Sequence, residues 1–242
     1  MQSLRKIFYP PTIGLFLYVL FILTLLVLLP LLLIGATKLV FANLGFSFTD
    51  ALLIIVLSLL GSTVNIPLFK IKTREPVLKI DYYTFFGVTY PIPTVINAQA
   101  ETLVAINVGG ALIPVILSLY LWYHFYVYTL RIVLAVLLVS VIVNRLAKPV
   151  KGMGIVVPAF IPPILAALFS LLLSLGKPEL AFSLAYISGS LGTLIGADLL
   201  NLKKLGELSA KIVSIGGAGT FDGVFMSGLL AVVLLVIFGF TP

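Results

Sequence analysis

Apolar segments of about 20 residues recur along this chain, and they restrict its fold more than any other feature. Hydrophobic residues make up 61% of the sequence and charged residues only 10%, whereas a soluble domain carries about 25% charged residues. A helix of about 20 apolar residues can cross the hydrocarbon core of a bilayer. We therefore predict an all-α integral membrane protein, a single transmembrane domain over 1–242 with about seven helices. The expected spans are 12–36, 50–69, 101–122, 126–145, 155–175, 179–199 and 221–240.

The positive charges predict how these helices are oriented. With a cytoplasmic N-terminus, all lysines and arginines fall in cytoplasmic connections except Lys38, Arg131 and Lys177, as the positive-inside rule requires. We expect a multi-pass protein of the cell membrane with an external C-terminus. The run from Ile13 to Ala36 is too long for a signal peptide, so we expect it to be a retained span. The net charge of +7 is assigned to orientation, so the lipid bilayer is an expected partner and nucleic acid is not.

One connection has a different pattern. Residues from Val77 to Tyr90 alternate between apolar and polar side chains, and a period of two is typical of a β-strand. Because an open sheet edge is not tolerated in lipid, we predict a small interfacial strand or β-hairpin over 77–96, between helices two and three. It would act either as an aromatic interfacial anchor or as an edge strand that pairs with an extended substrate.

The third apolar segment contains residues that interrupt helices, namely Gly109, Gly110 and Pro114. They predict a broken or kinked helix. Broken backbone at membrane depth is tolerated where it is buried in protein or lines a cavity, so Asn107 is expected to face the interior and find polar partners. Alternatively, the two glycines let two helices approach closely.

The residue types present argue against several kinds of chemistry. The chain has no cysteine, and His124 is its single histidine. Disulfides, thiol catalysis and thiolate metal sites are therefore excluded, and a histidine-based metal site or a Ser-His-Asp triad is not expected. We predict no metal and no cofactor.

Two of the eight acidic residues, Asp198 and Asp222, lie where the last two apolar segments meet their connecting loop. An ionisable group at membrane depth costs roughly 3 kcal/mol or more and is a functional candidate for that reason. Glycines surround both aspartates, and two asparagines could support them. The supporting residues that we expect are Asn107, Asn201, Gly196, Gly217, Gly219 and Gly223.

Two carboxyls at close range share one proton, as an aspartic protease requires for its general base and general acid. We expect the oxygens of Asp198 and Asp222 to lie within about 3–6 Å of each other. The two helices would pack through Gly189, Gly192 and Gly196. Alternatively, Thr220 or Asp222 only caps the last helix, and Asp198 forms an ion pair with Lys203 or Lys204.

The run SIGGAGTFDGVF, with GADLLNL before it, resembles a family of uncharacterised multi-pass prokaryotic membrane proteins, a domain of unknown function. The resemblance extends from about Asn107 to the C-terminus and implies no established activity. A weaker similarity is to the GxGD aspartyl intramembrane proteases, such as presenilin, signal peptide peptidase and prepilin peptidase. It implies one aspartate on each of two neighbouring helices near the cytoplasmic side. The match is incomplete, because Thr220 and Phe221 separate Gly219 from Asp222 and because the residue directly before Asp198 is not a tyrosine.

These observations predict an intramembrane aspartyl protease-like protein with catalytic Asp198 and Asp222, acting on a transmembrane peptide. A first alternative is a proton- or cation-coupled transporter or channel that uses the same acids. It is favoured by the interrupted third segment and by a weak parallel repeat between Val108–Ala111 and Ile215–Ala218. A second alternative is a structural membrane protein without a catalytic role. Substrate and oligomeric state stay open.

Overall fold

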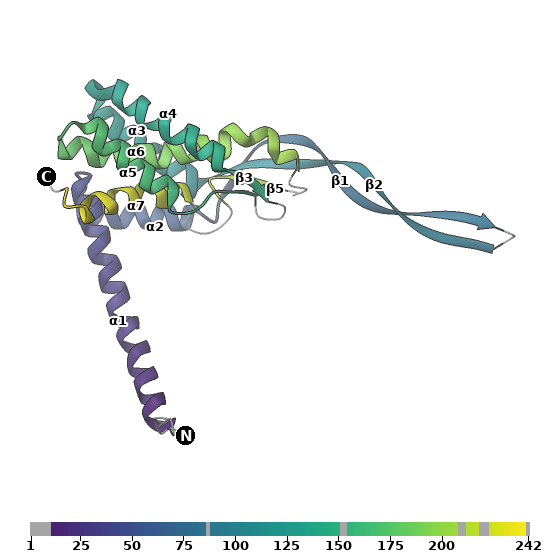
Figure 1. Ribbon diagram of the computed structural model, residues 1–242, viewed down its shortest axis with the longest axis horizontal. Coiled ribbons are helices and arrows are strands. Elements are labelled where there is room, and N and C mark those ends of the chain that lie inside the picture. Colours follow the sequence, from purple (N-terminus) through teal and green to yellow (C-terminus); the bar gives the residue numbers. More distant parts are fainter. Residues whose placement is uncertain (1–10, 86–87, 151–153, 208–211, 218–222, 241–242) are drawn as a thin grey trace, which may run out of the picture.

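The computed structural model describes residues 11–85, 88–150, 154–207, 212–217 and 223–240, and these are mostly helical (Figure 1). The last part of the chain forms a helical bundle, in which a short 3₁₀ turn, η2 (Tyr126–Tyr128), joins the first two helices. The helices of the bundle are α3 (Ile113–His124), α4 (Thr129–Leu146), α5 (Ile161–Ser174), α6 (Pro178–Thr193) and α7 (Gly223–Ile237).

The central helix of the bundle is α6. It packs against α3, α4, α5 and α7, and every residue from Leu180 to Thr193 is buried. A Cβ on Gly189 would lie 2.8 Å from the Ser227 carbonyl oxygen of α7, and one on Gly192 would lie 2.7 Å from the Val139 Cβ of α4. Small residues at helix contacts let backbones approach this closely. The side chains of α6 therefore lie where four helices meet.

Two helices precede the bundle. Helix α1 (Pro11–Asn43) projects away from it (Figure 1), and its side chains from Ile13 to Leu28 are exposed, whereas Phe41 is buried in the main core. Helix α2 (Phe48–Gly61) begins with a capping box, in which the side chains of Ser47 and Asp50 each accept a hydrogen bond from the other residue's backbone N–H. Such a cap satisfies N–H groups that have no partner within the helix.

Two of the described helical stretches, Tyr126–Leu146 and Pro178–Leu202, are long and apolar enough to cross a membrane. A third span results if Ile34–Asn43 and Phe48–Gly61, which meet at 109°, are counted together. The remaining apolar helices are shorter: Ile13–Leu28, Val108–His124, Ile161–Ser174 and Gly223–Ile237. The described residues thus contain two or three candidate spans, where the sequence led us to expect seven.

The hairpin is much longer than the expected 77–96. Strands β1 (Asn65–Phe85) and β2 (Val88–Asn107) pair antiparallel and extend far from the bundle (Figure 1). A short strand, β5 (Ile212–Ile215), pairs in parallel with Leu103–Ile106 at the base of β2. Strands β3 (Lys148–Val150) and β4 (Gly154–Val156) form a separate antiparallel pair.

Three expected spans therefore need correction, because residues 65–69, 101–107 and 155–156 are strand and not helix. Pro67 has no N–H to continue a helix that would run through it, and the ladder is irregular between Pro67 and Phe69. The residues before Asn107 are a short apolar run, which periodicity alone does not distinguish from a buried helix. Their pairing with β5, far away in the sequence, decides in favour of a strand.

The expected interruption at Gly109 and Gly110 is present as a π-helical turn, η1 (Val108–Leu112), between β2 and α3. Asn107 is 1% exposed and caps this turn, because its Oδ1 accepts from the Gly110 N–H at 2.7 Å. Its Nδ2 donates to the Ser62 carbonyl oxygen at 2.7 Å and to Asn65 Oδ1 at 3.1 Å. Asn107 thus faces the interior and has polar partners there, as we expected.

Candidate functional site

The candidate site begins where α6 loses its regular geometry. The helix continues as a π-helical turn, η3 (Leu194–Asp198), and then as a 3₁₀ stretch, η4 (Leu199–Glu207). Such irregular turns leave carbonyl groups without their usual partners, and they occur frequently at functional sites. Here two asparagine amides supply the missing hydrogen bonds. The Gly196 carbonyl oxygen accepts from Asn144 Nδ2 at 3.1 Å and from Asn201 Nδ2 at 3.0 Å, and the Ala197 carbonyl oxygen accepts from Asn201 Nδ2 at 2.9 Å.

Close packing on α4 explains why a glycine stands at position 196. A Cβ on Gly196 would lie 2.5 Å from the Ser140 carbonyl oxygen and 2.9 Å from the Val143 Cβ. Any side chain there would push η3 away from α4 and would separate the Gly196 carbonyl from Asn144. The contact therefore fixes the position of the turn that carries Asp198.

Asp198 is half-buried, and a backbone group from another element holds its carboxylate. The Gly216 N–H, directly after β5, donates to Asp198 Oδ2 at 2.8 Å. Gly216 has φ +78° and Gly217 has φ +88°, a region that favours glycine because it has no Cβ. A Cβ on Gly216 would collide with Ala111 of η1. The end of α6, the end of β5 and η1 therefore meet at this carboxylate.

Asp198 lines a cavity of about 230 Å³ between β4, the start of α5, the end of α6 and the start of α7. Its polar lining includes Thr193, whose buried Oγ1 has no hydrogen-bond partner among the described residues, and Ser227, whose Oγ donates to the Gly223 carbonyl oxygen at 2.5 Å. The rest of the lining is apolar: Ile155, Val156, Val157, Ala159, Pro162, Ala197 and Val224. A carboxylate in a small, mostly apolar cavity is suited to acid–base chemistry or to binding a cation.

The residues expected at the site lie at different places. Asp198 and Gly223 line the cavity, whereas Gly196 and Asn201 shape the turn behind it. Gly217 lies in the sharp turn after β5. Asn107 serves the junction between the hairpin and α2 instead. Asp222 and Gly219 lie outside the described residues, so the distance between the two aspartates stays a prediction.

The expected glycine packing between the last two helices is only partly correct. Gly189 contacts α7, but Gly192 and Gly196 contact α4. Helices joined by a short loop share all their small residues only when neither helix has another close neighbour. In the structure α6 has neighbours on all sides, so its glycines are divided between two of them.

Thr193, Ser227 and Asn144 are not among the residues expected from the sequence. Asn144 could have been found, because it is the one amide in the apolar run of α4. Hydroxyl side chains give a weaker signal, since serine and threonine are common at packed helix contacts in membranes. Only the tertiary structure shows that the hydroxyl of Thr193 shares a cavity with Asp198.

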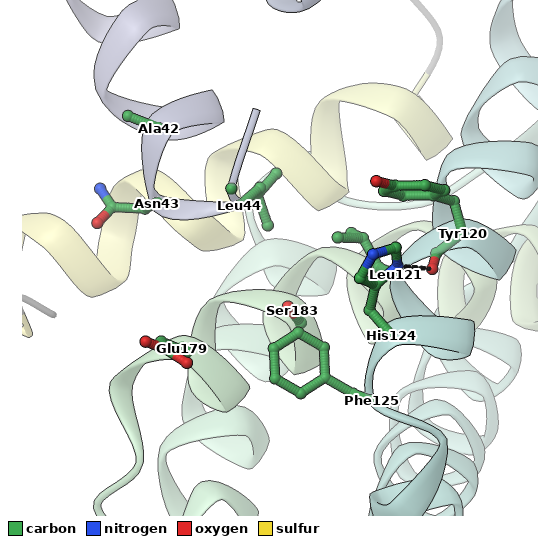
Figure 2. A pocket seen from close by; sticks show the side chains of 10 residues that line it. Ala42, Asn43, Leu44, Tyr120, Leu121, His124, Phe125, Glu179 and Ser183 are labelled. Atoms are coloured by element: carbon green, nitrogen blue, oxygen red, sulfur yellow. Dashed lines mark hydrogen bonds between the residues drawn. The ribbon is translucent and has the colours of Figure 1, made fainter. Parts of the chain in front are cut away.

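A second cavity, of about 510 Å³, lies near the first residues of α6 (Figure 2). Glu179 and Ser183 of α6 face it together with Tyr120, His124 and Phe125 from α3 and the turn after it, and Ala42–Gly45 at the end of α1 complete its lining. His124 Nδ1 lies 3.2 Å from the Tyr120 carbonyl oxygen. Among the described residues, no group of three His, Cys, Asp or Glu side chains is placed to hold a metal ion at either cavity.

Comparison with known families gives one match. The family model described as "Protein of unknown function (DUF1614)" matches residues 59–234, which is more than half of the chain. No curated protein and no solved structure matches this sequence. The matched range contains the hairpin, Asp198 and the start of α7, together with most of the residues that line the two cavities. The chain therefore belongs to the family of proteins of unknown function DUF1614.

Proposed function

We propose that this protein is a membrane-embedded aspartyl hydrolase that cleaves transmembrane peptides, with Asp198 and Asp222 as its acid pair. One observation carries the proposal: Asp198 and Gly223 line the same cavity, and Gly223 directly follows Asp222 in the chain. In the proposed reaction one carboxylate takes a proton from water while the protonated partner donates to the substrate carbonyl.

The edge of the three-stranded sheet supports a peptide substrate. The strand order is β1-β2-β5, so β5 has β2 on one side and pairs with no other described strand. An extended peptide can add to such an edge through main-chain hydrogen bonds. Since the residue after β5, Gly216, donates to Asp198, a peptide added along β5 would lead towards the carboxylate. The sequence suggests residues 77–96 as the edge strand that binds a substrate, but β5 is the strand whose end contacts Asp198.

The membrane topology belongs to the same proposal. Seven spans with a cytoplasmic N-terminus and an external C-terminus would put Asp198 and Asp222 at the cytoplasmic side. This arrangement is similar to that of the GxGD aspartyl intramembrane proteases, and it rests on the apolar segments and on the distribution of lysine and arginine.

The test uses aspartate-to-asparagine variants, which keep size but remove the titratable group. Vesicles would contain the protein and a panel of internally quenched single-span peptides. We expect Asp198→Asn and Asp222→Asn each to lower cleavage by about 100-fold or more, as loss of a general acid or base does. Asp50→Asn is the matched control, because Asp50 only caps α2. Full cleavage by either variant, or no cleavage by the parent, would contradict the proposal.

A cation-coupled transporter is the second candidate. It is favoured by the two π-helical interruptions, η1 and η3, because Gly216 contacts Ala111 of η1 while it donates to Asp198 of η3. Interrupted helices build ion sites in many transporters. The proposed repeat receives no such support, since Gly109 packs on α2 whereas Gly216 packs on η1. Cation flux without peptide cleavage in the same vesicles would favour the transporter.

A further inference from the structure

One face of α6 carries a row of polar side chains along its whole length. They are Glu179, Ser183, Tyr186, Ser190 and Thr193. Their spacing of four, three, four and three residues places them on one side of a helix. With a rise of about 1.5 Å per residue, the row is about 21 Å long. Glu179 is exposed, whereas the other four side chains are at most 5% exposed.

Three of these buried groups, Tyr186 Oη, Ser190 Oγ and Thr193 Oγ1, make no hydrogen bond of good geometry among the described residues. The Ser190 side chain nevertheless lies close to the Tyr186 hydroxyl and interacts with it. Buried polar groups are nearly always hydrogen-bonded, to protein or to internal water. Several hydroxyls without a well-formed hydrogen bond on one face of one helix are therefore best explained by water between them. Ser170 on α5 serves as a comparison, because it is equally buried but has a partner. Its Oγ donates to the Ala167 carbonyl oxygen at 2.7 Å.

The side chains of this row are close enough for single waters to bridge them. Neighbouring members are three or four residues apart, which corresponds to about 4.5–6 Å along the helix. A small residue of α7 lies beside the middle of the row. A Cβ on Gly228 would collide with Ser190 Oγ and would lie 3.0 Å from two Tyr186 ring atoms. The glycine therefore lets α7 pack directly against Ser190 and Tyr186.

Each end of the row opens into a cavity. Glu179 and Ser183 face the wider cavity in Figure 2, beside His124 and Phe125. At the other end Thr193 lines the smaller cavity together with Asp198. The row thus connects an acidic side chain in one cavity with an acidic side chain in the other.

We propose that this face of α6 is a hydrated proton path between the two cavities, from Glu179 through Ser183, Tyr186, Ser190 and Thr193 to Asp198. A proton that arrives at one hydroxyl forms a new O–H bond there, while that oxygen releases its own proton to the next water or hydroxyl. Every hydroxyl on the path ends neutral, and the proton that leaves the Glu179 carboxyl group ends on the Asp198 carboxylate, so one proton moves in total and no other reactant is needed. This function goes beyond the proposed hydrolysis.

Proton flux into vesicles tests the path. Purified protein is reconstituted in liposomes that enclose a pH-sensitive dye, and a potassium gradient with valinomycin drives protons inward. The parent should acidify the lumen faster than protein-free vesicles do. Tyr186→Phe, Ser190→Ala and Thr193→Val should each lower the flux by about tenfold or more, as loss of a proton-transfer group does. Ser170→Ala makes the same change off the path and should conduct like the parent.

Thiol labelling tests hydration without a membrane gradient. Because the chain has no cysteine, single Ser183→Cys, Ser190→Cys and Thr193→Cys variants report on one site each. In detergent, a small charged thiol reagent should label all three at least about tenfold faster than Ser170→Cys, since the thiolate forms in water. Equal, slow labelling at all four positions would overturn the proposal.

The flux assay also separates this proposal from the hydrolase. If the parent conducts no faster than protein-free vesicles, the path is wrong while peptide cleavage can still occur. If Tyr186→Phe and Ser190→Ala fold normally and conduct like the parent, the path is also wrong. Loss of flux in both variants with unchanged peptide cleavage would support the path, and an inactive parent in the cleavage assay would contradict the hydrolase alone.

Discussion

At the scale of single residues, a backbone N–H and two side-chain amides help to position Asp198. The Gly216 N–H donates to its carboxylate, and the Gly196 carbonyl just before it is held by Asn144 and Asn201. Both glycines are required by contact with another element, Gly196 with α4 and Gly216 with η1. The position of the carboxylate therefore depends on two glycines without side chains as well as on the amides of Asn144 and Asn201.

Gly216→Ala tests this dependence, and Gly176→Ala is its matched control. Both glycines have φ +78°, but a Cβ on Gly176 has no atom within 4 Å, whereas one on Gly216 would collide with Ala111. The left-handed conformation alone costs an alanine about 1–2 kcal/mol. We expect Gly216→Ala to lower the free energy of unfolding by about 1–3 kcal/mol more than Gly176→Ala does, because of overpacking. Denaturant unfolding in detergent measures both, and equal losses would contradict the contact.

At the scale of elements, the chain interrupts its helices where it needs close contacts. Turn η1 follows β2 directly, and Asn107 joins the strand to the turn by hydrogen bonds on both sides. Ser58 Oγ of α2 donates to the Gly109 carbonyl oxygen at 2.7 Å. Two alternatives were expected for Gly109 and Gly110: an interrupted helix, or a close approach of two helices. The structure has both, because the glycines lie in η1 and Gly109 packs closely on α2.

Gly109→Ala tests the junction between η1 and α2. A Cβ on Gly109 would collide with the Ser58 carbonyl oxygen and the Ser62 nitrogen, which are both backbone atoms. Backbone cannot rotate away as a side chain can, so we expect a loss of about 3 kcal/mol in unfolding free energy. Gly35→Ala in α1 is the control, because no atom lies within 4 Å of its Cβ. It should leave stability unchanged or raise it by about 0.5–1 kcal/mol.

At the scale of the whole molecule, a buried helix connects two cavities that each contain an acidic side chain, while the most exposed apolar surface lies on other helices. Helix α1 exposes its side chains from Ile13 to Leu28, and α2 exposes several more. Large exposed apolar surfaces mark contact with a membrane or with another protein. The two ends of α6 should then be accessible from opposite sides of a membrane.

Cysteine labelling in sealed vesicles tests this orientation. Leu175, just before α6, and Lys204, in η4 after it, are both exposed. With a cytoplasmic N-terminus, Leu175→Cys should react with a membrane-impermeant reagent from the external side only, and Lys204→Cys from the cytoplasmic side only. Labelling of both from one side would contradict the proposed topology.

The amino-acid sequence by itself determined the helix-rich, apolar character of the chain, the presence of a hairpin between the second and third apolar segments, and the family. Those properties follow from composition, local periodicity and a contiguous motif, which need no knowledge of distant contacts. Asp198, which lines the smaller cavity, was also identifiable as a candidate, because a carboxylate is rare in such a sequence and Gly196 stands two residues before it.

The tertiary structure alone decided which apolar runs are strands and which residues share a cavity with Asp198. The run before Asn107 is a strand because β5, more than a hundred residues later, pairs with it. Gly192 and Gly196 face α4 because α6 is surrounded on all sides. Thr193 and Ser227 meet Asp198 because α6, α7 and β4 converge there. Each of these outcomes depends on contacts between segments far apart in the chain, and local sequence patterns carry no record of such contacts.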